Sequence, residues 1–201
     1  MEIACAGLSV LNQCERVSYN YLDMEDNYVR LAKLAVRRAV TGGEVDEGEL
    51  EELRGALPES PRGVFVTLKK DGMLRGCIGT YHPSTDSLAG EILRNGSSAA
   101  LDDPRFPSVS PDELEDISIS VDVLSEPEEC ARDELNPNKY GILLEKGMRS
   151  GLLLPDLDGV ESVDEQIDIT KRKAGIPPGD ENYTVKRFTV ERHHGEKPVG
   201  K

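Results

Sequence analysis

The sequence predicts an α+β fold in which a mainly antiparallel sheet packs against helices. Strand-like stretches occur as hairpins; the first joins residues 64–69 to 73–80 through Asp71-Gly72, a pair suited to a tight turn. Amphipathic helical stretches stand between the hairpins without a regular βαβ rhythm. With 37% hydrophobic and 31% charged residues among 201, the chain suits a globular protein with a modest core.

Capping residues place the predicted helices. Asp26 opens the first helix, which runs to Val40 before Gly42-Gly43. Proline at 104 stops the third helix, because the residue before a proline avoids the helical conformation. The helices are predicted at 26–40, within 47–61, at 86–101 and from the capping box 162–165 to Ala174, with a short helical turn after the capping box 110–113.

The remaining strands are predicted from alternation and turn residues. Residues 117–123 alternate between apolar and polar, residues 140–155 form a hairpin that turns near Lys146-Gly147, and residues 183–190 form the last strand. Residues 191–201 read as a polar end of the chain, where we expect His193 and His194 to be solvated.

Charge and cysteine usage narrow the function classes. A formal charge of −14 disfavours binding to nucleic acid or to anionic lipid. No apolar run approaches the roughly 20 residues that span a bilayer, and Glu2 stands where a secretory signal needs basic residues. The four cysteines, at 5, 14, 77 and 130, form no CxxC pair, so we expect reduced thiols, a cytoplasmic location and no zinc site.

The segment "RGCIG" is the main candidate for chemistry. On a strand, Arg75, Cys77 and Gly79 share one face, so the Arg75 guanidinium should lower the pKa of a Cys77 thiol that Gly79 leaves open. Gly76 lets a ligand or another backbone approach the opposite face. Cys77 is therefore a candidate nucleophile or covalent anchor. The alternative is packing, in which the glycines mark a close crossing and the cysteine is a small buried hydrophobe.

Two neighbouring segments extend this predicted pocket. Tyr81 and His82 follow the strand directly, and the start of the next helix at 84–86 offers amide groups to an anion. In "DDPRF", Asp103 and Arg105 could orient each other and clamp a carboxylate or phosphate. The alternative for the second segment is a structural loop in which Asp103 caps a turn.

The order of motifs resembles the AMMECR domain family, whose prokaryotic members are called AmmeMemoRadiSam system protein A. The resemblance rests on "LRGCIGT", "ALDDPRFPSV", "ISISVDVLSEP" and "GLLLP", in this order. It implies an α+β fold with a larger and a smaller subdomain and a cleft between them near the RGCIG segment. It also divides the chain into three segments. Residues 1–22 form an N-terminal extension that is either flexible or ordered, residues 23–192 form the AMMECR-like domain, and residues 193–201 form a polar tail.

The resemblance names partners but no reaction and no cofactor. It implies a system with a Memo-type protein, similar to extradiol dioxygenases, and a radical S-adenosylmethionine protein. The sequence departs from the family pattern after "GLLLP": it has no tryptophan, and residues 170–173 replace the usual central cysteine of the following helix. Three hypotheses stay open: an enzyme or substrate-binding protein centred on Cys77, a non-catalytic adaptor for those partners, and a nucleic-acid regulator, which the charge makes the weakest.

Overall fold

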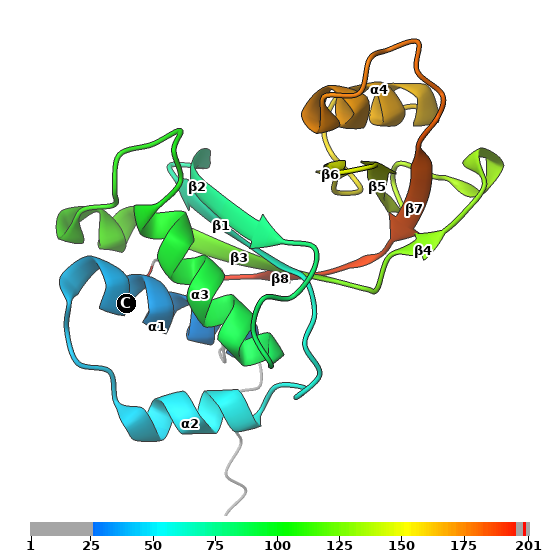
Figure 1. The fold of residues 1–201 in the computed structure, drawn as a ribbon. Helices are drawn as coiled ribbons and strands as arrows, with labels where there is room; N and C mark the ends of the chain where they lie inside the picture. Colours follow the sequence, from blue (N-terminus) through cyan, green and yellow to red (C-terminus); the bar gives the residue numbers. More distant parts are fainter. Residues whose placement is uncertain (1–25, 196–198, 200–201) are drawn as a thin grey trace, which may run out of the picture.

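The computed structural model describes residues 26–195 and residue 199. The chain forms two four-stranded antiparallel sheets with helices, which confirms the α+β prediction and divides the expected sheet in two. Figure 1 shows two lobes, each built on one sheet. The predicted extension at 1–22 and most of the predicted tail lie outside the described residues.

The large lobe contains sheet A and the first three α-helices. Sheet A has the order β2-β1-β3-β8, and all its neighbours are antiparallel. Its elements are α1 (Asn27–Thr41), α2 (Glu47–Gly55), β1 (Val64–Lys70), β2 (Met73–Thr80), α3 (Leu88–Leu101), the 3-10 helix η1 (Pro111–Asp116), β3 (Ile117–Leu124) and β8 (Val190–His194).

The small lobe contains sheet B and one α-helix. Sheet B has the order β4-β7-β5-β6, and α4 packs on β5 and β6. Its elements are β4 (Glu128–Glu129), the 3-10 helix η2 (Arg132–Glu134), β5 (Gly141–Lys146), β6 (Arg149–Leu153), α4 (Val163–Ala174) and β7 (Thr184–Phe188).

Local capping confirms two predicted helices closely. Asp26 accepts a hydrogen bond from the Tyr28 amide at the start of α1, and Gly42 ends that helix in the left-handed conformation. Ser162 and Glu165 form the predicted capping box of α4, and Gly175 ends it. The third predicted helix begins two residues late, at Leu88, with Ser87 as its N-cap.

The helices cover only one face of sheet A. Val64, Val66 and Leu68 of β1 alternate inward and join a core shared with α1, α2 and α3. The intervening Phe65 and Thr67 point to the opposite face, which we call the outer face. This face carries no helix of the large lobe, as Figure 1 shows.

The last strand of the chain corrects two predictions. Thr189 interrupts the predicted strand 183–190, so that β7 belongs to sheet B and β8 to sheet A. His193 is buried rather than solvated, because it faces α1, stacks on Tyr28 and contacts Asp26 through Nδ1 at 2.7 Å. His194, its neighbour, is exposed as expected.

Two adjacent linkers and one apolar cluster join the lobes. The Ser125 amide donates to the Thr189 carbonyl at 2.9 Å, and the Thr189 amide donates to Ser125 Oγ at 2.9 Å. The cluster contains Leu124, Leu143, Leu152 and Phe188, with Phe65 and Tyr81 against it. No helix in the described part of the chain is both long and apolar enough to cross a membrane.

Candidate functional site

Strand β2 places Cys77 at the edge of sheet A with its side chain on the outer face. Gly76 and Ile78 face the helices instead. A Cβ at Gly76 would lie 2.2 Å from the Ala99 carbonyl oxygen of α3. This glycine therefore serves the close approach of another backbone, one of the two possibilities that the sequence left open.

Gly79 does not leave the open space that we expected beside the thiol. A Cβ there would lie 2.2 Å from the ring of Phe65, its direct partner on β1. The ring fills the outer face at Gly79 and continues into the apolar cluster that joins the lobes. The Gly79 prediction is corrected for this reason: the missing side chain accommodates an aromatic ring of the protein itself.

Cys77 is a free thiol of intermediate exposure, held from three directions. Thr67 Oγ1 donates a hydrogen bond to its sulfur at 3.2 Å. Its backbone N–H donates to Asp103 Oδ2 at 2.8 Å, and its carbonyl accepts from Arg105 Nη2 at 3.1 Å. The main chain around the sulfur is thus fixed, while the residue as a whole is partly exposed.

The "DPRF" segment binds the edge of β2. The Asp103 carboxylate is buried and accepts from the backbone N–H and Nε of Arg105 through Oδ1, and from Arg105 Nη2 through Oδ2. The hydrogen bonds from Arg105 hold the pKa of Asp103 far below its usual range, although burial opposes this effect. The Asp103 carboxylate therefore binds groups of the protein itself, as the structural-loop alternative proposed. The Arg105 side chain is 54% exposed.

Arg75 does not act on Cys77 in the way that the sequence predicted. Its Nε and Nη2 bind the two carboxylate oxygens of Glu113 at 3.0 and 2.9 Å. Its other hydrogen bonds reach the carbonyls of Pro107 and Ser108. The guanidinium of Arg75 therefore holds the 103–113 loop, and Arg105 is the cation beside Cys77 instead. The hydrogen bond to Asp103 is the main cause of the raised pKa of Arg105, and attraction to Cys77 contributes to it.

Lys173 of α4, an exposed residue of the small lobe, interacts electrostatically with the same place, and sequence reasoning missed it. Partial desolvation lowers the pKa of Lys173, attraction to Cys77 opposes this shift, and repulsion from Arg105 adds to it. The three groups are therefore close enough for their charges to act on each other. A lysine near the end of a helix ordinarily suggests only interaction with the helix dipole. Only the packing of the two lobes reveals its proximity to Cys77.

The outer face around Cys77 is polar. Pairing places Thr67 opposite Cys77, Ser120 opposite Thr67, and His194 opposite Ser120. Because side chains alternate along each strand, these four residues form one row across sheet A on the outer face. Sequence reading missed Thr67 and Ser120, since each is an ordinary polar position of an alternating strand.

Tyr81 and His82 lie at a separate groove between the lobes. The groove has a volume of about 530 Å³ and is also lined by Arg62 and by Lys186 of β7. Tyr81 Oη lies 3.2 Å from Ser150 Oγ of the small lobe. Cys77 does not line this groove, so the structure divides the single predicted pocket in two.

The helix-start amides that we expected to bind an external anion hold a carboxylate of the protein. Glu91 is completely buried and accepts from the backbone amides of Ser84 and Thr85 at 2.9 and 3.0 Å. Burial would raise the pKa of Glu91, but hydrogen bonds from Thr80, Ser84 and Thr85 lower it. This corrects the prediction. Glu91 holds the 80–85 turn in place, and this turn positions Tyr81 and His82 at the groove between the lobes.

Among residues 26–195 and 199, no group of three or more His, Cys, Asp or Glu side chains is placed to hold a metal ion.

Comparison with known proteins defines the family. The model of the AMMECR1 family matches residues 29–193. The chain belongs to the AMMECR1 family. A Thermotoga maritima protein is 52% identical over 172 residues, which cover 84% of this chain and 98% of that protein. A Clostridium acetobutylicum protein is 46% identical over 189 residues, 92% of this chain, but this chain spans only 40% of its length.

A solved structure has the same fold as this chain. The crystal structure of an uncharacterised protein from Pyrococcus horikoshii is 34% identical and matches with a TM-score of 0.75, covering 87% of this chain and 92% of that one. This chain and the Pyrococcus horikoshii protein therefore share one fold.

Proposed function

We propose that this AMMECR1 protein binds a small-molecule ligand or substrate on the outer face of sheet A, at Cys77, where the two lobes meet. The observation that carries the proposal is a partly exposed cysteine whose sulfur accepts a hydrogen bond from Thr67 and whose backbone is held by Asp103 and Arg105. Such a thiol can serve as a nucleophile or as a covalent anchor for a ligand. As in the AmmeMemoRadiSam system that the motifs indicate, the protein would act with a Memo-type and a radical S-adenosylmethionine protein.

Three features support this site over a packing role for Cys77. The backbone of Cys77 is immobilised by Asp103 and Arg105, which limits the entropy lost when a ligand binds there. Thr67 donates a hydrogen bond to the sulfur and so orients it on the outer face. Cys77 also stands outside the three apolar core clusters, whereas Cys130 packs against the core of the small lobe.

Alkylation of the native protein with iodoacetamide, resolved by peptide mass spectrometry, tests the proposal. We expect Cys77 to react faster than a free thiol of the same concentration at pH 7, and Cys130 to react more slowly. Burial raises the pKa of Cys130, which makes it a reference within the same molecule. A Cys77 that reacts no faster than the free thiol would contradict the proposed site.

One comparison favours the adaptor as a second candidate. In the Clostridium relative the matching 189 residues are 40% of the protein, so a domain of this kind is joined there to additional chain. A domain fused in one organism can act as a separate partner in another. We expect the protein to co-purify with a Memo-type or radical S-adenosylmethionine protein from the same genome. Binding that survives Cys77→Ser would favour the adaptor, and absence of binding with both partners present would argue against it.

A further inference from the structure

The groove between the lobes contains two opposite charges that the protein itself does not join. It has a volume of about 530 Å³ and is lined by Arg62, which precedes β1, and by Glu126 of the linker that follows β3. Both residues are exposed, and within residues 26–195 and 199 neither forms an ion pair, with the other or with any third residue. A ligand in this groove can therefore meet both a guanidinium and a carboxylate.

Lys186 also lines the groove, but its charge is already balanced. Its Nζ lies 2.7 Å from Oε2 of Glu145, on the adjacent strand β5. This pair carries no net charge. With His82 neutral, the unpaired charges of the groove are therefore those of Arg62 and Glu126, and a ligand that carries a single charge can satisfy only one of them.

Two rings and three prolines line the same groove. The ring centres of Tyr81 and His82 are 4.6 Å apart, and their planes are tilted by 47°. Rings at such an angle can offer the face of one and the edge of the other to a third ring. Pro61, Pro83 and Pro127 add rigid apolar surface. These walls suit a flat, largely apolar body.

The backbone around the groove is held without a ligand. The Leu124 amide donates to the Gly63 carbonyl at 2.9 Å, which ties the start of β1 to the end of β3. A Cβ at Gly63 would lie 2.7 Å from the Tyr81 carbonyl oxygen, so the missing side chain lets these two segments approach closely. Ser125 of the linker is hydrogen-bonded to Thr189. A groove that is formed in advance loses little conformational entropy when a ligand binds.

We propose that this groove binds a small zwitterion with a flat ring, of the chemical class of the aromatic amino acids. Its carboxylate pairs with Arg62, its ammonium group pairs with Glu126, and its ring lies against Tyr81 and His82. Cys77 does not line this groove, so the site does not depend on the function proposed for the thiol. Because Lys186 brings the small lobe to the groove, a bound ligand contacts both lobes.

Three indole probes that differ only in charge test the inference. L-tryptophan carries both charges, indole-3-propionate carries only the carboxylate, and tryptamine carries only the ammonium group. The chain contains no tryptophan, so the fluorescence of a bound probe has no tryptophan background. At pH 7 and low ionic strength we expect L-tryptophan to bind about threefold more tightly than either other probe, since each exposed ion pair is weak.

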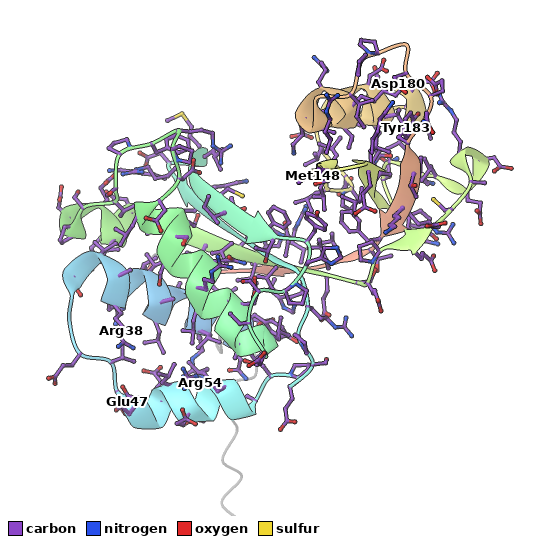
Figure 2. All side chains as sticks on the ribbon, in the orientation of Figure 1. Arg38, Glu47, Arg54, Met148, Asp180 and Tyr183 are labelled. Carbon is purple, nitrogen blue, oxygen red and sulfur yellow. The ribbon has the colours of Figure 1, made fainter. Side chains whose placement is uncertain are left out.

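Two charge variants assign the ends of the ligand. Arg62→Gln should lower the affinity for L-tryptophan to that for tryptamine without weakening tryptamine, and Glu126→Gln should lower it to that for indole-3-propionate. Arg54→Gln is the matched control, because Arg54 lies on α2, as Figure 2 shows, and pairs with Glu51. His82→Ala should weaken all three probes alike, by about fivefold, because it removes a ring from the groove.

The outcomes separate this proposal from the one at Cys77. Cys77→Ser should leave the binding of L-tryptophan unchanged, and a loss of binding would place the probe at the thiol and overturn the assignment to the groove. Equal affinities for the three probes, unaffected by Arg62→Gln and Glu126→Gln, would overturn the zwitterion as the class of ligand. If none of the probes binds at millimolar concentration, the proposed site is wrong.

Discussion

At the edge of β2, side chains form the backbone hydrogen bonds that a neighbouring strand forms elsewhere in a sheet. The outward N–H and C=O of Cys77 are paired by the side chains of Asp103 and Arg105. An edge strand with unpaired backbone groups invites association with other chains. The RGCIG and DPRF motifs are therefore one structural unit: the second covers the edge of the first and leaves the thiol uncovered.

Glu113 gives a prediction at this scale, because it holds Arg75 and the 103–113 loop. Its pKa falls from 4.5 to about 2, mainly through the hydrogen bond from Arg75 and against the effect of burial. A lowered pKa means that Glu113 stabilises the fold fully above pH 4.5 and that this contribution is lost as the pH falls toward 2. We expect Glu113→Gln to lower the free energy of unfolding by about 2 kcal/mol at pH 7.

Urea unfolding at pH 7 and at pH 3, followed by circular dichroism, measures this effect. The difference between wild type and Glu113→Gln should shrink at pH 3, because the Glu113 carboxyl of the unfolded chain is protonated there while that of the folded protein stays ionised. Glu115→Gln removes an exposed carboxylate on the same 3-10 helix and should change little at either pH. A Glu113→Gln protein as stable as wild type at pH 7 would refute the assignment.

At the scale of elements, both sheets use the same pairing of a phenylalanine with a glycine. Phe65 of β1 lies over Gly79 of β2, and Phe188 of β7 lies over Gly141 of β5. A Cβ on either glycine would come within 2.2 or 2.3 Å of the ring. Each glycine lets a ring lie flat on its own sheet and reach the apolar cluster between the lobes.

Gly79→Ala tests this pairing. We expect it to destabilise the protein by about 2 kcal/mol, because the ring of Phe65 must move out of the cluster. In Phe65→Ala/Gly79→Ala the second substitution should cost at least about 1 kcal/mol less than it costs alone, since the clash is gone. Gly55→Ala, at an open helical position, should be neutral or slightly stabilising. Additive effects of Phe65→Ala and Gly79→Ala in urea unfolding would show that the two do not interact.

The elements also show what the sequence could predict. The caps of α1 and α4 and the Asp71-Gly72 turn were predictable because each depends on residues within a few positions. The burial of His193 was not, because its partner Asp26 is 167 positions away. The predicted partners of Arg75 failed for the same reason: the sequence could not show that Glu113 binds its guanidinium, or that the register of β2 shifts between Gly76 and Leu74 and interrupts the alternation from Arg75 to Cys77.

At the scale of the whole molecule, the lobes depend on one apolar cluster and two linkers. Phe188 is 1% exposed and lies at the point where β7 passes through Thr189 into β8. Around it, residues of both sheets meet in a single cluster. The lobes have separate cores of their own, so this cluster governs how strongly they are coupled.

Phe188→Ala should therefore cost about 3–5 kcal/mol and uncouple the lobes. In hydrogen exchange we expect the amides of β5 and β6 to exchange earlier than those of β1 and β3, as two units of different stability. Phe106→Ala, in the partly exposed loop after α3, should leave exchange in both lobes close to wild type. A Phe188→Ala protein that still exchanges as one cooperative unit would show that the linkers alone couple the lobes.

The contact between Asp26 and His193 has a consequence for engineering. It brings the start of the first helix against the final strand, on the side of sheet A opposite to Cys77. A circular permutant that connects these two points and opens the chain at the exposed Gly147-Met148 turn should keep both lobes intact. Domains or affinity tags fused near Asp26 or His193 would likewise extend from the face of sheet A opposite to Cys77 and would not cover the thiol.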